Sequence, residues 1–323
     1  MLPDVRTLQA RLTSALANGS NATQPVNILE RSLPPFMSTF PNEIVTCELG
    51  GQKRRLFLKH GGGRSHDSFG HRGDVAYEAE VYERLLRQVP DFRPKCFGSL
   101  MQAAQSCLIL EYLNGSVRVS DLTYNRIPRQ RRAMVISSRW LGKFHDQHQT
   151  RISDPSLKFL KRYDAAYFRG WAKRTVTFSR PLREQFPWLR ELERIGDSWF
   201  APLLDGAPTI IHGEFYAKTL LLRRTEVFVL DWESSAVAAG EIDLAALTEG
   251  THWPDGLVQA CQRAYVKARW PQGAPPTFRS RLNAARIYLH LRWLGERRQW
   301  AVRPKTLWRY QQLHRVLQEA ALI

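Results

Sequence analysis

The residues most able to do chemistry are concentrated between Ile210 and Ala245. One apolar run leads into His212-Gly-Glu214, and a second apolar run, a short distance downstream, leads into Asp231-Trp-Glu. Strands that end in this way would expose Glu214 and Asp231 close together. Two such carboxylates divide the work of phosphoryl transfer, because one accepts the proton of a hydroxyl nucleophile and the other holds Mg²⁺ on the phosphates. A lone strand-end histidine or aspartate is usually structural, so the order and spacing of all these residues carry the prediction.

Strands are expected mainly in the first third of the chain. Gly50-Gly51 predicts a tight turn between two strands, because glycine adopts positive φ at little cost. Tyr77, Val81 and Leu85 recur at helical spacing, which predicts a helix over 74–88. A short helix is also expected within 1–17. The predicted strands are 26–29, 43–49, 55–59 and 107–112.

The remainder of the chain favours helices, since its apolar residues recur at helical spacing over long stretches. The helical stretches are 130–148, 155–204 and 255–323, with short strands at 209–211 and 227–230. A strand-rich front followed by helices predicts an α+β fold of two lobes. We expect a strand-rich N-terminal lobe over 1–113 and a helical C-terminal lobe over 114–323, which contains the loop 210–233.

The composition is that of a globular chain with an excess of positive charge. The 323 residues carry 47 Lys and Arg against 30 Asp and Glu, a net charge of +17. This field attracts anions such as a nucleotide or an acidic substrate, although an arginine-rich surface can also be solvated without a dedicated partner. No apolar run approaches the roughly 18 residues of a membrane span. Four scattered cysteines and an N-terminus unlike a signal peptide predict a cytoplasmic protein with reduced thiols.

Three motifs in this order and spacing resemble the aminoglycoside/choline-kinase-like phosphotransferase family, which has a protein-kinase-like fold. The family pattern is His-Gly-Asp-x-x-x-x-Asn, then an apolar residue with Asp-Trp-Glu, then Gly-x-x-Asp-Leu-Ala. Here the three read His212-Gly-Glu-Phe-Tyr-Ala-Lys-Thr219, Leu230-Asp-Trp-Glu233 and Gly240-Glu-Ile-Asp-Leu-Ala245. His-Gly-Glu-Phe-Tyr is similar to a bacterial branch in which glutamate replaces the first aspartate. The resemblance covers residues 26–250 and is strongest over 209–247.

The resemblance implies a role for each matching residue. Glu214 takes the place of the catalytic base, and His212 that of the loop histidine that braces the base. Asp231 takes the place of the Mg²⁺ ligand, and Thr219 that of an asparagine that also binds Mg²⁺. Asp243 takes the place of an aspartate that we interpret as structural support for the loop.

Upstream, the resemblance implies a nucleotide site. Lys59 ends a strand as the phosphate-contacting lysine of the family does, and Glu78 matches the helix glutamate that pairs with that lysine. Glu80 is the competing choice, and Lys59 alone could equally be a surface lysine. The backbone of Glu111 to Leu113, at the end of the family's hinge strand, would contact adenine. The cofactors implied are ATP or GTP, with Mg²⁺.

The chain departs from the family pattern at three places. The phosphate-covering loop should lie within 29–40, yet this segment has no glycine. Either Ser32, Ser38 and Thr39 bind phosphate through their hydroxyls, or the segment is an ordinary strand turn. Glu214 is longer than aspartate by one methylene group, so its backbone must adjust. Thr219 offers a hydroxyl where the family has an amide oxygen, so either the second metal is weakly held, or Glu233 or a water substitutes for the missing ligand.

The last fifty residues are strongly basic and rich in aromatic side chains. Residues 274–323 contain ten Lys or Arg and two acidic residues, and this charge would disfavour a polycationic acceptor if it faces the acceptor pocket. The aromatic residues are either base-stacking platforms or helix core. Because no RNA- or DNA-binding motif accompanies them, we favour core and expect no nucleic-acid partner. They are Tyr288, Trp293, Trp300, Trp308 and Tyr310.

These features predict an ATP-dependent phosphotransferase that acts on a hydroxyl of a small molecule. The acceptor is expected to be neutral or anionic, as an antibiotic, a natural-product intermediate or a metabolite can be. Two alternatives stay open. One is a peptide Ser/Thr kinase of natural-product maturation, and the other is a catalytically weakened, pseudokinase-like module that binds a peptide or a protein. No membrane partner is expected.

Overall fold

A computed structural model of the chain describes residues 2–17, 25–34, 40–62, 68–89, 91–101, 106–122, 127–250 and 253–323. The chain divides into two compact units. The first unit consists of Met1–His66, Gly70–Val117 and Leu221–Ser234, and the second of Asp67–Phe69, Arg118–Leu220 and Ser235–Ile323.

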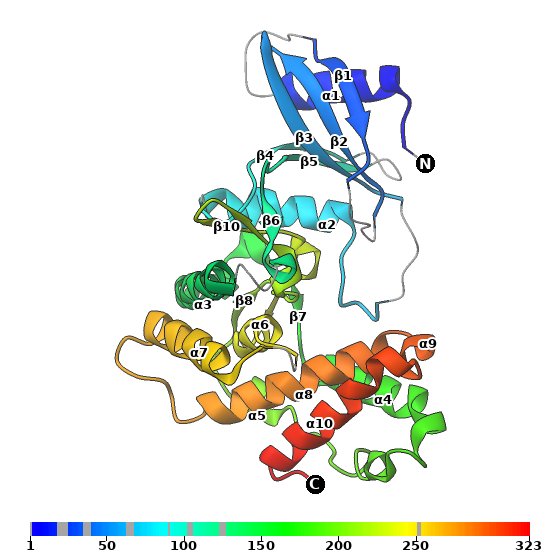
Figure 1. Cartoon of the computed structure of the whole chain (residues 1–323), viewed down its shortest axis with the longest axis vertical. Helices are drawn as coiled ribbons and strands as arrows, with labels where there is room; N and C mark the ends of the chain where they lie inside the picture. The colour runs from blue at the N-terminus through cyan, green and yellow to red at the C-terminus, as the bar shows by residue number, and fades with distance from the viewer. Residues whose placement is uncertain are drawn as a thin grey trace. The chain divides into compact units, whose positions relative to one another are not determined.

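The first unit is built on a five-stranded antiparallel sheet of order β1-β2-β3-β5-β4. Gly50 and Gly51, both with positive φ, make the turn between β2 and β3. Helix α1 (Val5–Ala17) lies against one face of the sheet (Figure 1). Alternate strand residues such as Leu56 and Leu58 pack into the core with Leu8 and Leu12 of α1. The strands are β1 (Asn27–Ser32), β2 (Asn42–Leu49), β3 (Gln52–His60), β4 (Cys96–Leu100) and β5 (Cys107–Glu111).

One helix of the first unit carries the sequence-predicted glutamates. The predicted helix over 74–88 begins as α2 (Val75–Glu80), which Asp74 caps by accepting the Tyr77 N–H. It continues as a π-helical turn at Val81–Leu85 and a 3₁₀ turn at Leu86–Gln88. A separate three-stranded sheet has the order β10-β9-β6, with β6 at Val117–Arg118, β9 at Leu220–Arg223 and β10 at Glu226–Val229.

The second unit is mainly helical. Helix α8 (Phe278–Glu296) is almost entirely buried and packs against α4, α6 and α10 (Figure 1). Helix α3 packs closely on α7. A side chain at Gly142 would not fit there, because its Cβ would lie only 2.5 Å from the Tyr265 carbonyl oxygen. The other helices are α3 (Ile127–Gln149), α4 (Ala165–Phe178), α5 (Ala201–Leu204), α6 (Glu241–Leu247), α7 (Asp255–Arg269), α9 (Arg298–Ala301) and α10 (Leu307–Glu319).

A small sheet of order β7-β11-β8 completes the second unit, with β7 at Lys161–Arg162, β8 at Thr209–Ile211 and β11 at Ala236–Ala238. The predicted helical stretch 155–204 is wrong outside α4 and α5, because it contains β7 and, after α4, short 3₁₀ turns. Pro181 and Pro187 lie in short 3₁₀ turns there, because proline cannot donate the hydrogen bonds of a helix interior. The predicted α+β fold, strand-rich first and helical afterwards, is confirmed. No helix among the described residues is long and apolar enough to cross a membrane.

Candidate functional site

Lys59 is the centre of a buried cluster in the first unit. Its Nζ lies 2.6 Å from Oε2 of Glu78 and 2.6 Å from Oε2 of Glu233. Oδ1 of Asp231 is 3.5 Å from the same nitrogen. Lys59, Glu78 and Glu233 are buried, whereas the Asp231 side chain is 49% exposed. The structure therefore brings together three sequence-predicted residues, and Glu233, named from the sequence as a possible substitute metal contact, pairs with the same ammonium group.

Helix α2 decides between the two candidate glutamates. Glu78 is buried, and its Oε1 accepts the Trp232 N–H at 3.0 Å while Oε2 faces Lys59. Glu80 instead pairs with Arg84 at 3.3 Å, and both of these side chains are exposed. Glu78 is thus the glutamate that contacts Lys59.

The Lys59 cluster has an excess of negative charge. Three carboxylates face one ammonium group, which gives a net charge of −2 when all four groups are ionised. Burial lowers the pKa of Lys59, but the carboxylates of Glu233, Glu78 and Asp231 outweigh burial and raise the pKa well above its usual value. Burial raises the pKa of Glu78 to about 7, and the other two carboxylates add to this effect. A divalent cation would balance the excess.

Asp231 has an unusual backbone. Its φ of 60° lies in the left-handed region, which costs a non-glycine residue about 1–3 kcal/mol and persists only where the surrounding structure imposes it. Strand β10 ends at Val229, and the half-buried Leu230 separates it from Asp231, so the turn directs a half-exposed carboxylate away from the core. Strain of this kind is concentrated at functional sites.

The donor set around Asp231 fits Mg²⁺. Magnesium prefers oxygen ligands and is usually held by one or two carboxylates together with phosphate oxygens and water. The described residues contain no group of three His, Cys, Asp or Glu side chains able to hold a metal by themselves. One exposed carboxylate beside a negative cluster therefore suits a cation that is shared with a nucleotide.

The end of β5 offers one backbone donor. The Glu111 N–H donates to the Lys95 carbonyl at 2.8 Å, and the Glu111 carboxylate accepts from Arg223 at 3.0 Å. The Leu113 N–H has no hydrogen-bond partner within the described part of the chain, although its carbonyl accepts from Ser116. Leu113 can thus donate to a planar base. Ser38 and Thr39 lie outside the described residues.

The second unit holds the His-Gly-Glu loop at the end of β8. Asp243, on α6, accepts the His212 N–H at 2.6 Å and the Gly213 N–H at 2.9 Å. His145 contacts the same carboxylate at 3.3 Å. Gly213 has a φ of 83°, which glycine adopts without strain. These contacts support the interpretation of Asp243 as the loop's structural support.

Glu214 is held from two sides. Its N–H donates to Nδ1 of His212 at 3.2 Å, so the histidine braces the backbone of the loop. Its Oε1 lies 3.1 Å from Nη2 of Arg292, a fully buried residue of α8. Sequence reasoning missed this contact, because nothing in the local pattern of α8 distinguishes Arg292 from the other arginines of that helix.

Arg292 binds several groups around the loop. Its Nη2 donates to the Tyr216 hydroxyl at 2.9 Å, and its Nη1 lies 3.5 Å from Glu296. Burial lowers the pKa of Arg292, but Tyr216, Glu214 and Glu296 outweigh it and raise the pKa well above the usual value. The guanidinium therefore stays charged, and it fixes the longer glutamate side chain in place of the family's aspartate.

The Thr219 hydroxyl stabilises the loop through hydrogen bonds to its carbonyl groups. This hydroxyl lies 3.0 Å from the Glu214 carbonyl and 2.9 Å from the Tyr216 carbonyl. The side chain is buried, and the single hydroxyl proton is used by these carbonyls. Only its oxygen lone pairs remain for a metal or a phosphate, so the predicted metal contact stays a prediction.

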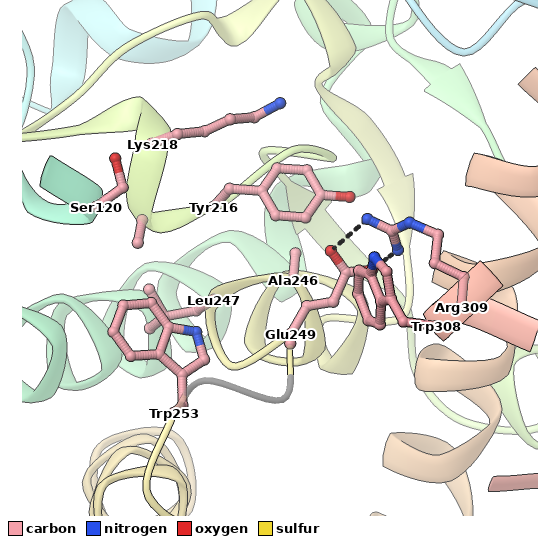
Figure 2. Close-up of a pocket in the computed structure, with 11 residues that line it drawn as sticks. Ser120, Tyr216, Lys218, Ala246, Leu247, Glu249, Trp253, Trp308 and Arg309 are labelled. Atoms are coloured by element: carbon pink, nitrogen blue, oxygen red, sulfur yellow. Dashed lines mark hydrogen bonds and ion pairs between the residues drawn. The ribbon is translucent and has the colours of Figure 1, made fainter. Parts of the chain in front are cut away.

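A cavity of about 370 Å³ lies beside this loop, within the second unit (Figure 2). Three consecutive loop residues line it, and the rest come mainly from the segment after α6 and from α10. Arg309 of α10 binds the Glu249 carboxylate at 2.5 and 3.3 Å. The lining residues are Ser120, Tyr216, Ala217, Lys218, Ala246, Leu247, Glu249, Gly250, Trp253, Trp308 and Arg309.

Five of the ten basic residues of 274–323 pair with carboxylates in the described part of the chain. Arg281 pairs with Glu241 at 3.1 Å, and Arg286 with Glu319 at 3.0 Å. Among the basic residues of this segment, Arg309 is the one that the described lining of the cavity includes. Tyr288 and Tyr310 are fully buried, which agrees with the core interpretation for these two residues, whereas Trp293, Trp300 and Trp308 are half-buried.

A model of the phosphotransferase enzyme family matches residues 45–276. No curated protein sequence matches the chain. Several solved structures are similar to it over nearly its whole length. The choline kinase LicA from Streptococcus pneumoniae is 14% identical, with a TM-score of 0.63 and coverage of 97% of this chain and 98% of that one. LicA in complex with AMP is also similar, with 15% identity, a TM-score of 0.57 and 98% coverage of both chains.

Two further structures show the same likeness. The choline kinase from Cryptosporidium parvum Iowa II is 13% identical, with a TM-score of 0.64 and coverage of 99% and 98%. The aminoglycoside phosphotransferase from Alicyclobacillus acidocaldarius is 13% identical, with a TM-score of 0.58 and coverage of 99% and 94%. At these identities the likeness shows the fold, and it confirms the predicted protein-kinase-like class.

Proposed function

The chain belongs to the phosphotransferase enzyme family, and we propose that it transfers the terminal phosphoryl group of ATP or GTP to a hydroxyl of a neutral or anionic small molecule, with Mg²⁺. One observation carries the proposal. Lys59 is buried in contact with Glu78, and the half-exposed carboxylate of Asp231 lies 3.5 Å from the same ammonium group.

The first unit supplies groups that suit a nucleotide. Lys59 would contact the phosphates, and Glu78 and Glu233 would hold its ammonium group in one position. The Leu113 N–H, next to Glu111, would donate to the base. The AMP complex of LicA, which has the same fold, supports nucleotide binding.

Asp231 would hold Mg²⁺, because its carboxylate is exposed and belongs to a cluster with an excess of negative charge. When bound, Mg²⁺ neutralises charge on the phosphate oxygens. Asp231 and Lys59 would then orient the phosphates from two sides, and Lys59 would remain charged because the carboxylates around it raise its pKa.

The second unit supplies the base. The Glu214 carboxylate would orient the acceptor hydroxyl and accept its proton, a function that contributes about 10²–10⁴ to the rate of an enzyme. His212 and Asp243 fix the backbone of the loop, and Arg292 fixes the carboxylate. Thr219 would maintain the loop and add at most a lone-pair contact to a metal or a phosphate.

A second candidate is a catalytically weakened module that binds nucleotide and a peptide or protein. The hydrogen bonds of Thr219 to the loop carbonyls favour it, because they use the hydroxyl for loop structure rather than for metal binding. In this candidate the Lys59 cluster would bind nucleotide, but no phosphoryl group would be transferred.

Phosphoryl transfer from labelled ATP to a panel of neutral and anionic alcohols tests the proposal. We expect turnover for at least one acceptor, and a loss of tenfold or more in Glu214→Ala. Glu226→Ala, which removes an exposed glutamate of β10, should leave turnover unchanged. Full activity of Glu214→Ala would refute the assignment of the base. Nucleotide binding without transfer to any acceptor would favour the second candidate.

A further inference from the structure

A second hollow of the second unit, an open groove, lies along helix α7. It has a volume of about 650 Å³ and shares no lining residue with the cavity beside the Glu214 loop. Five residues of α7 line it, together with four residues between Trp270 and Phe278, where the chain passes from α7 to α8 (Figure 1). The groove is therefore separate from the residues to which the proposed phosphotransfer assigns a role.

The shape of the groove favours an extended chain segment over an enclosed small molecule. None of the nine lining residues is buried, and five are exposed. Sites for small molecules are usually clefts that bury most of the ligand surface. From Gln259 to Trp270 the groove follows α7 for about 16 Å, given the rise of the helix per residue. A peptide can lie along a groove of this length and stay partly in solvent.

The apolar part of the groove is formed by rings that the protein holds in place. The ring centres of Trp270 and Phe278 lie 5.6 Å apart, with the rings edge to face. The buried guanidinium of Arg269 lies 4.5 Å from the Trp270 ring, and Tyr265 contacts the same indole edge to face. Trp270 is only half-buried, so part of its surface stays accessible. Fixed aromatic surfaces of this kind are typical anchor points of protein interfaces.

Two cations of the groove are not matched by the chain. Arg263 and Lys267 are exposed residues of α7, one helical turn apart, and neither makes an ion pair, hydrogen bond or ring contact with another described residue. The described lining contains no Asp or Glu. Arg269 of the same helix, in contrast, pairs with Glu241 at 3.4 Å. Like charges four residues apart repel each other on a helix, and bound carboxylates would relieve this repulsion.

The polar groups of the groove match the chemistry and the spacing of an extended peptide. Gln259 and Gln262 carry amides that can donate to a backbone carbonyl and accept from a backbone N–H. Arg263 and Lys267 lie about 6 Å apart along the helix axis. Alternate residues of an extended chain point to the same side and lie about 7 Å apart. Two acidic residues separated by one residue can therefore reach both cations.

We propose that this groove docks an acidic, extended peptide segment of a partner protein. Two carboxylates of the segment pair with Arg263 and Lys267, and an apolar side chain packs on Trp270 and Phe278. A nucleic-acid strand needs more cations than the two in the described lining, and a membrane surface would not enter a groove whose apolar residues are half-buried. The inference goes beyond the proposed phosphotransfer and does not depend on it.

The capped peptide Phe-Ser-Glu-Ser-Glu-Ser-Phe tests the proposal, and it reads the same in both directions, so the direction of the bound chain does not matter. Its binding to the full chain is measured by calorimetry without nucleotide. We expect binding at least tenfold tighter than that of three control ligands, and an affinity that falls as salt rises from about 0.05 to about 0.5 M. The controls are Phe-Ser-Lys-Ser-Lys-Ser-Phe, Ser-Ser-Glu-Ser-Glu-Ser-Ser and a thymidine hexanucleotide.

A double change of the two cations, Arg263→Glu with Lys267→Glu, should reverse the preference, so that the lysine peptide binds at least tenfold more tightly than the glutamate peptide. Arg303→Glu with Lys305→Glu makes the same charge change at two exposed positions outside the groove and should preserve the preference. Thermal unfolding verifies that both variants are folded. The proposal would be overturned by an unchanged preference in the first variant, by no binding of the glutamate peptide at about 5 mM, or by tighter binding of the hexanucleotide.

Discussion

The Lys59 cluster and the cavity beside the Glu214 loop differ in how their charges are balanced. In the first unit three carboxylates face one ammonium group, and all but Asp231 are buried. In the second unit Arg309 binds the cavity carboxylate of Glu249 with both terminal nitrogens, and it lies over the ring of Trp308. The net charge of +17 is therefore a poor guide to either site.

This difference teaches that local charge, rather than the charge of the chain, decides what each unit can bind. The negative cluster suits a divalent cation that accompanies a nucleotide, whereas Glu249 and Arg309 at the cavity neutralise each other. The carboxylates that pair with Arg281, Arg286 and Arg292 reduce the field that the basic C-terminal segment would otherwise produce.

The largest expected effect follows from removing the buried guanidinium of Arg292 in the second unit. Arg292→Met removes the positive charge that Glu214 and Glu296 face inside the protein. We expect a loss of about 3–5 kcal/mol in the free energy of unfolding, measured by urea denaturation. The matched control is Arg286→Met on the same helix, whose pair with Glu319 is partly exposed and should be worth at most about 1 kcal/mol. Equal effects of the two changes would show that burial of Arg292 is unimportant.

A smaller effect, on the stability of the second unit, is expected at acidic pH. Burial lowers the pKa of His148 to about 4, and its Nδ1 lies 2.7 Å from the Phe144 carbonyl. Because the folded state disfavours protonation of His148, the contribution of this histidine to the free energy of unfolding is fully present above its unfolded pKa near 6.5. This contribution is lost as pH falls toward 4.

This loss should be on the order of 3 kcal/mol for His148. We expect His148→Phe, which can keep the stack on Phe144, to flatten the fall in unfolding free energy between pH 6.5 and 4. His314→Phe provides the control on α10. An unchanged pH dependence in His148→Phe would contradict the predicted role of this histidine.

The smallest expected effect concerns Thr219. An asparagine can restore an amide oxygen for the metal and still donate to the loop carbonyls. Thr219→Asn should therefore keep turnover or raise it severalfold, whereas Thr219→Val, which has no hydroxyl, should lower it. Steady-state kinetics with one acceptor measure both. A loss of activity in Thr219→Asn would show that the loop requires threonine for its structure.

The fold was predictable where the signal is local. The Gly50-Gly51 turn and the apolar spacing around Tyr77 are short-range patterns, and the predicted turn and the start of the helix follow them. Prolines in 155–204 were visible too, yet the periodicity of aromatic residues outweighed them in the prediction. The 3₁₀ turns at Arg180–Leu182 and Pro187–Arg190 show that the prolines decide the local conformation.

The site was predictable only in part, for a related reason. The loop from His212 to Thr219 is one continuous motif, and its internal contacts can be expected from order alone. The pairs Glu214–Arg292 and Glu249–Arg309 join residues that are distant in sequence, and no periodicity specifies them. Packing of α8 and α10 determines these pairs, so the charge of the cavity could not be derived from the charge of the segment.

The most direct test of the account is the dependence of nucleotide binding on Mg²⁺. ATP is titrated into the wild type and into Asp231→Asn, with and without 5 mM Mg²⁺, and the affinities are measured by calorimetry. Lys59→Ala is titrated in parallel with Lys53→Ala, which changes an exposed lysine of the same strand.

The account predicts that Mg²⁺ tightens ATP binding to the wild type at least tenfold, and that Asp231→Asn loses this effect while remaining folded. Lys59→Ala should weaken binding in both conditions, and Lys53→Ala should not. Equal ATP affinity of the wild type with and without Mg²⁺, or undiminished binding by Lys59→Ala, would contradict the assignment of the Lys59 cluster as the magnesium–nucleotide site.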